Sequence, residues 1–74
     1  SNAQIYIDLC HKRMKALKIN FGDLVEINVW DQRTLTERKK NGVLIDYRSN
    51  GLVNVLYDDK INVVSLRTIS RIKG

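Results

Sequence analysis

The feature that most constrains the fold is a series of short runs in which apolar and polar residues alternate, separated by tight-turn signals. The alternation begins in FGDLVEINVW and resumes, after a polar stretch, in GVLIDYRSNGLVNVLYDDKINVVSLRTISRI. A period of two is typical of strands that bury one face. Because 74 residues allow one domain at most, we expect a small β-barrel. A barrel of this size has no interior room for a ligand, so its function is expected on its surface.

Turn signals predict how the strands are connected. Asn50-Gly51 is the strongest two-residue hairpin signal, because both residues tolerate positive φ. A second hairpin is predicted at Asp58-Asp59-Lys60. Leu66, Ile69 and Ile72 then recur every three residues, which predicts one helical turn followed by a short closing strand. The expected total is five strands.

The alternation also predicts which side chains face the core. In the first strand Val25, Ile27 and Val29 share one side, so Trp30 is expected to point away from the core. In the second strand the side expected to face the core consists of Val43, Ile45 and Tyr47. In the third strand it consists of Val53, Val55 and Tyr57.

Residues 4–18 are predicted to form an amphipathic helix. Its apolar stripe consists of Ile5, Leu9, Cys10, Met14 and Leu17. Asp8 lies early and the basic residues lie late, which complements the helix dipole. Asn20 or Gly22 is expected to take the left-handed turn that ends the helix. Its basic face is interpreted either as a solvated surface or as an extension of a phosphate-binding surface.

The domain organisation is predicted from the first residues. Ser1-Asn2-Ala3 resembles the remnant of an expression tag, and the next residue is Gln4 instead of Met. We therefore expect a fragment of a larger protein, with a helix over 4–18 and one β domain over 21–73. The helix stripe is a candidate contact with the remainder of that parent protein.

Three runs carry a resemblance to a known fold family: Gly22-Asp23-Leu24-Val25, Gly42-Val43-Leu44-Ile45, and the stretch from Val53 to Asp59. They resemble the SH3-like small barrels, and among these the Tudor and KOW types. The resemblance implies a mainly β fold, a five-stranded SH3-like barrel with one N-terminal helix, that acts as a binding module.

The Tudor resemblance further implies an aromatic cage with an acidic group, which holds a methylated lysine or arginine by cation–π contacts. The residues that match this pattern are Trp30, Tyr47, Tyr57 and Asp59, with Asp58 as the alternative acid. Tyr47 and Tyr57 lie on the side of the core valines, so either ring is alternatively part of the core.

Charge favours a different ligand. Thirteen basic and eight acidic residues give a net charge of +5, which is typical of a nucleic-acid binder. Five basic residues lie in or beside the polar loop over 31–41: Arg33, Arg38, Lys39, Lys40 and Arg48. Together with Trp30 they form a candidate surface for phosphate contacts and base stacking on RNA or DNA. Thr34 and Glu37 have capping-box spacing, which predicts a helical turn within this loop.

Nucleic-acid binding is therefore the first hypothesis for function. The alternatives are a Tudor-like module that binds a peptide, and a structural adaptor of a larger protein. A solvated basic loop without a ligand is the remaining interpretation of the charges.

No catalytic constellation is recognised. Cys10 and His11 are adjacent, and adjacent side chains on a helix point about 100° apart, so they do not form a nucleophile and base pair. Asp58 and Asp59 lack further oxygen ligands at the spacing of a metal site. The four glycines lie too far apart for a phosphate loop. We expect no enzyme activity, cofactor or metal.

The chain contains a single cysteine and no apolar run of the length needed to cross a bilayer. We expect no internal disulfide and no membrane contact. The expected location is intracellular, either cytoplasmic or nuclear.

Overall fold

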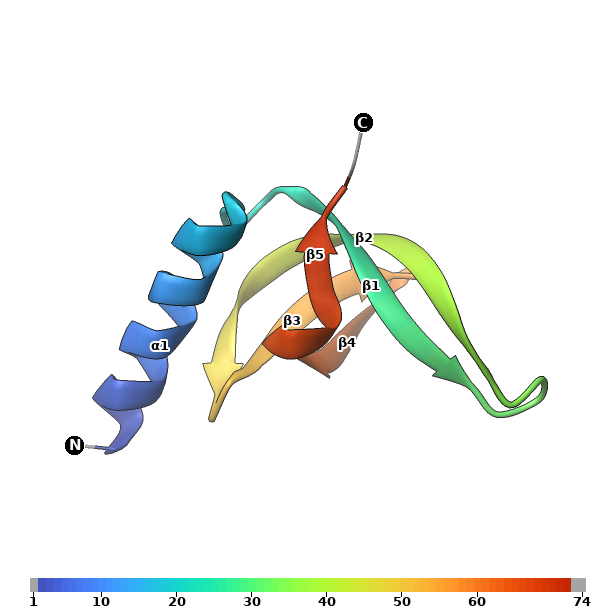
Figure 1. Cartoon of the computed structure of the whole chain (residues 1–74), viewed down its shortest axis with the longest axis horizontal. Helices are drawn as coiled ribbons and strands as arrows, with labels where there is room; N and C mark the ends of the chain where they lie inside the picture. Colours follow the sequence, from blue (N-terminus) through green and yellow to red (C-terminus); the bar gives the residue numbers. More distant parts are fainter. Residues whose placement is uncertain (1, 73–74) are drawn as a thin grey trace.

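A computed structural model describes residues 2–72. One helix precedes five antiparallel strands that form a single sheet (Figure 1). The elements are α1 (Asn2–Leu17), β1 (Leu24–Asp31), β2 (Thr36–Ser49), β3 (Leu52–Tyr57), β4 (Lys60–Ser65), the 3₁₀ turn η1 (Leu66–Thr68) and β5 (Ile69–Arg71).

The strand order is β4-β3-β2-β1-β5, so β4 and β5 are the two edges of the sheet. β2 is the longest strand: its first half pairs with β1 as far as Val43, and its second half pairs with β3. Within residues 2–72 the edges β4 and β5 do not pair with each other, and the sheet is open. The mainly β fold with an N-terminal helix is confirmed, whereas closure into a barrel is not.

Both predicted hairpins are present. Asn50 and Gly51 have φ values of 49° and 80°, and Asp58 and Asp59 have φ values of 51° and 63°. Positive φ at both central residues is the geometry of a type I′ turn, whose twist matches that of the flanking strands. Lys60 is already the first residue of β4. The predicted helical turn and closing strand are η1 and β5.

The polar loop over 31–41 is much shorter than expected. β1 ends at Asp31 and pairs there with Thr36, so the turn consists only of residues 32–35. The predicted helical turn is absent: Thr34 is hydrogen-bonded to the side chain of Thr36, and Glu37 lies in β2. Pairing with β1 gives the backbone N–H and C=O groups of residues 36–41 hydrogen-bond partners. A single helical turn would leave most of these groups unpaired.

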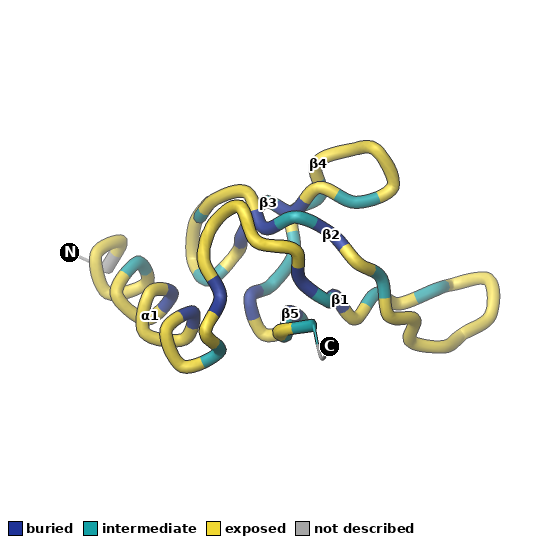
Figure 2. The backbone as a smooth tube through the Cα atoms, turned by 90° about the horizontal axis from the view of Figure 1, so that it is seen from above, coloured by how far each residue is buried: buried dark blue, intermediate teal, exposed yellow. Residues whose placement is uncertain are grey.

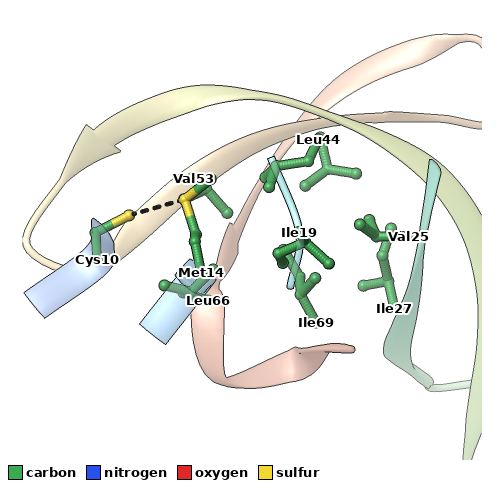
Figure 3. Packing of buried hydrophobic residues seen from close by; sticks show 10 residues of the cluster. Cys10, Met14, Ile19, Val25, Ile27, Leu44, Val53, Leu66 and Ile69 are labelled. Atoms are coloured by element: carbon green, nitrogen blue, oxygen red, sulfur yellow. Dashed lines mark hydrogen bonds between the residues drawn. The ribbon is translucent and has the colours of Figure 1, made fainter. Parts of the chain in front are cut away.

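Buried side chains from the helix and from β1, β2, β3, η1 and β5 form one core (Figure 3). Its members are Cys10, Met14, Ile19, Val25, Ile27, Leu44, Val53, Val55, Leu66 and Ile69. Trp30 is 56% exposed, as its place in the alternation predicts.

The predicted facing of β2 is wrong near its middle. Leu44 is fully buried and Ile45 is exposed, the reverse of the expected arrangement. The pairing with β3 shifts register between Leu44 and Asp46. A bulge there adds one residue to β2, which returns Tyr47 to the core side, where it is partly buried.

Two expectations about the helix also need correction. α1 ends at Leu17, and the left-handed residue that closes it is Lys18, with φ 58°. Gly22 also has positive φ, 94°, but it lies in the connection that follows. The N–H of Ile19 donates to the carbonyl of Met14, and the N–H of Lys18 donates to that of Lys15. These bonds form a Schellman motif.

The apolar stripe of α1 is only half used. Cys10 and Met14 are buried, and Leu17 packs against the core, but Ile5 and Leu9 are 57% and 56% exposed. Figure 2 shows that the first turns of the helix are largely exposed while the last turns meet the buried core. The sheet covers only the C-terminal half of the stripe.

Candidate nucleic-acid interface

β1 and β2 extend together beyond the core and end in the 32–35 turn (Figure 1). We call residues 28–39, at the end of this hairpin, the hairpin arm. Its register places Trp30 opposite Glu37, Val29 opposite Arg38, and Asn28 opposite Lys39. Because opposite residues share a face of the sheet, Lys39 lies on the face of Trp30 and Arg38 lies on the other face. The predicted basic residues are thus on one hairpin but on two faces.

The face that carries Trp30 also carries Lys39. Trp30 is 56% exposed and is not among the residues packed against the core, so its ring is accessible to a ligand. The Lys39 side chain is 72% exposed, and its Nζ lies 3.6 Å from Oε1 of Glu26. This face therefore combines an exposed aromatic ring with a weakly held cation.

A groove of about 310 Å³ at the end of the hairpin arm is lined by Val29, Trp30, Asp31, Arg33, Arg38 and Lys40. Asp31 organises it: its Oδ2 lies 3.0 Å from Nε of Arg38, and its Oδ1 accepts a 2.9 Å hydrogen bond from the backbone N–H of Arg33. Sequence reasoning missed Asp31, whose role follows from its place at the end of β1 beside the turn.

Lys40 is held in place at the base of the hairpin arm. Its Nζ forms an ion pair with Asp58 and lies 5.7 Å from the centroid of the Tyr57 ring. Tyr57 and Asp58 are two candidate members of the aromatic cage. Lys40 thus occupies the place that a ligand cation would take against this ring and carboxylate.

The other cage candidates are not brought to the same place. Tyr47 lies opposite Val53, whereas Tyr57 lies opposite Lys60. The two positions are separated by four residues of β3, or about 13 Å of extended strand. Neighbouring antiparallel strands run in opposite directions. The C-terminal end of β2 therefore lies at the opposite end of the sheet from the C-terminal ends of β1 and β3, and the three do not meet at one rim. Asp59 is exposed in the β3–β4 turn.

Arg48 is exposed, as predicted, but it lies near the opposite end of β2 from the hairpin arm. An extended strand covers roughly 33 Å over the ten residues from Arg38 to Arg48 at about 3.3 Å per residue. In Figure 1 the end of β2 lies beside α1, far from the 32–35 turn. Arg48 does not belong to the same surface.

Other chemistry has little support among the described residues. Burial raises the pKa of the Cys10 thiol, which disfavours a reactive thiolate. Within residues 2–72, no three His, Cys, Asp or Glu side chains are grouped to hold a metal ion. In the same range, α1 lacks the length and apolar character of a membrane-spanning helix.

Comparisons with protein-family models, with curated proteins and with solved structures gave no match.

Proposed function

We propose that this chain is a non-catalytic, SH3-like module of the Tudor or KOW type that binds nucleic acid through the hairpin arm. The fold proposal is supported by the strand order β4-β3-β2-β1-β5 and by the 3₁₀ turn before β5. The observation that carries the functional proposal is an exposed Trp30 on a projecting hairpin, with Arg33, Arg38 and Lys39 on the same arm.

The ion pairs of the arm do not prevent phosphate binding. The cations Arg38 and Lys39 are 57% and 72% exposed, whereas their partners Asp31 and Glu26 are only 18% and 30% exposed. Pairs between exposed side chains contribute about 0–1 kcal/mol, so a phosphate competes most easily at Lys39, whose pair is the more exposed and is 3.6 Å long. Lys40 is less available, because its side chain is only 35% exposed and contacts both Asp58 and Tyr57. We therefore assign the phosphate contacts to Arg33, Arg38 and Lys39.

Trp30 supplies the second part of the interaction. Stacking of one base on an aromatic ring contributes about 1–3 kcal/mol and works best on single strands, whose bases are unpaired. Three phosphate contacts predict that log K falls with log salt with a slope of about −2. Single-stranded RNA or DNA is the preferred ligand in this arrangement.

The test is fluorescence anisotropy of labelled single-stranded RNA, single-stranded DNA and duplex DNA at low and at physiological salt, with Trp30 emission followed in parallel. Trp30→Ala is expected to weaken single-strand binding by about 5- to 150-fold, the equivalent of 1–3 kcal/mol. Ile61→Ala is the matched control, because Ile61 is 55% exposed but lies on β4. Absence of binding at low salt, or equal affinity of the Trp30 variant, would contradict the proposal.

A charge-matched pair of variants separates a local site from general attraction. Arg38→Glu with Lys39→Glu changes the net charge by the same amount as Lys12→Glu with Lys15→Glu on the exposed face of α1. The first pair is expected to abolish binding, and the second to weaken it only through long-range electrostatics. Equal effects of the two pairs would show that the hairpin arm is not the site.

The peptide-binding alternative is supported by one contact, that of Lys40 with Tyr57 and Asp58, because this ring and carboxylate already hold a cation. A methylated lysine from a partner would have to displace Lys40. Titration of a trimethyl-lysine peptide into wild type and Lys40→Ala tests it: binding that appears only in the variant would support a cage that is filled by the chain itself.

A further inference from the structure

The segment of α1 from Tyr6 to Arg13 forms one wall of a second groove, which we call the helix groove. It has a volume of about 320 Å³, and its other walls are the β2–β3 turn and η1. The lining residues that matter here are Tyr6, Leu9, Arg13, Gly51, Leu66 and Arg67. In Figure 1 helix α1, which lines this groove, and the hairpin arm lie toward opposite ends of the molecule, whose longest dimension is 40 Å.

The helix groove is apolar at its base and partly open. Leu66 is buried beneath it, while Tyr6 and Leu9 are 41% and 56% exposed. The wall opposite the helix is fixed, because the N–H of Leu66 donates a 3.0 Å hydrogen bond to the carbonyl of Gly51. Apolar side chains that belong to an amphipathic stripe, but remain uncovered beside a preformed hollow, are typical of a docking surface.

Charge indicates what kind of segment fits. Arg13 lies on α1 and Arg67 on η1, and both contribute to the same groove. Within residues 2–72, neither is among the side chains that form an ion pair. The nearest acid along the helix, Asp8, accepts a hydrogen bond from Gln4. An apolar hollow with two arginines is complementary to apolar side chains flanked by carboxylates.

We infer that the helix groove binds an acidic peptide segment with large apolar side chains. The apolar side chains enter between Leu9 and Leu66, and the carboxylates contact Arg13 and Arg67. A second copy of this chain fits poorly, because each copy carries a net charge of +5 and brings the same two arginines. The inference goes beyond nucleic-acid binding, and it can hold or fail independently because the two surfaces are separate.

The experiment is a titration of the ¹⁵N-labelled chain, followed by amide NMR, with an acetylated and amidated peptide of about ten residues that contains glutamate, leucine and phenylalanine. One control peptide replaces glutamate by glutamine, and the other replaces leucine and phenylalanine by serine. The expected result is chemical-shift change at Tyr6, Leu9, Arg13, Gly51 and Arg67 with the first peptide only. A single-stranded oligonucleotide is titrated separately.

The variants test the two halves of the groove's chemistry. Arg67→Gln and Leu9→Ser are each expected to weaken binding of the acidic peptide about tenfold or more. The first removes one charge-assisted contact, and the second removes a leucine side chain that the peptide would cover. Both side chains are exposed, so the fold should persist, which far-ultraviolet circular dichroism checks. Ile61→Ser is the matched control for Leu9→Ser, since Ile61 is 55% exposed and lies on β4.

Four outcomes would overturn the inference. These are absence of groove shifts at millimolar peptide, equal shifts with the glutamine peptide, groove shifts with the oligonucleotide instead of the peptide, and concentration-dependent groove shifts without any ligand. The last outcome would identify a second copy as the occupant.

Discussion

Of Gly22, Gly42 and Gly51, Gly42 is the glycine at which an added methyl group would meet crowded neighbours. It is buried on the core side of β2, opposite Val25. A Cβ at this position would lie 2.7 Å from the backbone oxygen of Leu56 and 2.9 Å from both Ile27 Cδ1 and Val55 Cγ1. Distances under 3.0 Å force a shift, and the closest of these atoms is backbone, which moves only with β3.

We therefore expect Gly42→Ala to lower the free energy of unfolding by about 1–3 kcal/mol, the usual cost of overpacking. The reduced entropy of the unfolded chain offsets about 0.4–1 kcal/mol of this. A chain of this length has a total stability of about 4–11 kcal/mol. The net loss of about 1.3 kcal/mol corresponds to a fall in Tm of roughly 5–10 °C.

Urea and thermal denaturation followed by far-ultraviolet circular dichroism measure this change. Ile27→Val removes Cδ1, one of the three crowded atoms, at an ordinary cost of about 0.5–1.5 kcal/mol. The double variant with Gly42→Ala should then lose less stability than the sum of the single variants, by about 0.5 kcal/mol or more. An unchanged Tm for Gly42→Ala, or strict additivity with Ile27→Val, would refute the packing argument.

Three further predictions follow from local contacts. Burial raises the pKa of the Cys10 thiol above its ordinary value of 9.0, so the unfolded chain loses this proton first and the free energy of unfolding falls as pH rises through about 9. In urea titrations from about pH 8 to 10, the free energy of unfolding should fall less steeply with pH in Cys10→Ala than in the wild type. Identical slopes in the two proteins would contradict this. Asn50→Ala should lower the free energy of unfolding by about 1–2 kcal/mol because φ is 49° there, whereas Asn50→Gly should retain stability; urea midpoints that rank the two variants the other way would contradict the turn assignment. Lys40→Ala removes contacts with Asp58 and Tyr57 at a partly exposed site, so urea denaturation should show that the free energy of unfolding falls by less than about 1 kcal/mol. The NMR signals of the Tyr57 ring protons should shift in this variant. Unchanged Tyr57 signals would contradict the contact.

The sequence predicts the elements whose chemistry is local. The two turns at Asn50-Gly51 and Asp58-Asp59 follow from the tolerance of these residues for positive φ. The faces of β1 and β3 follow from a period of two, and η1 with β5 follows from the spacing of Leu66 and Ile69. None of these depends on knowing what lies across the sheet.

The errors occur where the outcome depends on a neighbouring strand. The polar residues 36–41 read as a loop, because nothing in their own pattern shows that β1 continues far enough to pair with them. The bulge between Leu44 and Asp46 reverses the facing of β2 without a glycine or proline to mark it. Helix periodicity likewise predicts the stripe of α1, but not that the sheet leaves Ile5 and Leu9 uncovered.

The candidate site shows the same dependence in its charges. The basic run Arg38-Lys39-Lys40 suggests one strongly positive loop, but a strand distributes successive side chains over two faces. Arg38 then pairs with Asp31, Lys39 with Glu26, and Lys40 with Asp58. The local field of the hairpin arm is therefore weaker than its composition suggests, and a ligand must gain from exchanging carboxylate for phosphate and from stacking on Trp30. This is why duplex DNA, which offers phosphates but no unpaired bases, should bind more weakly than a single strand.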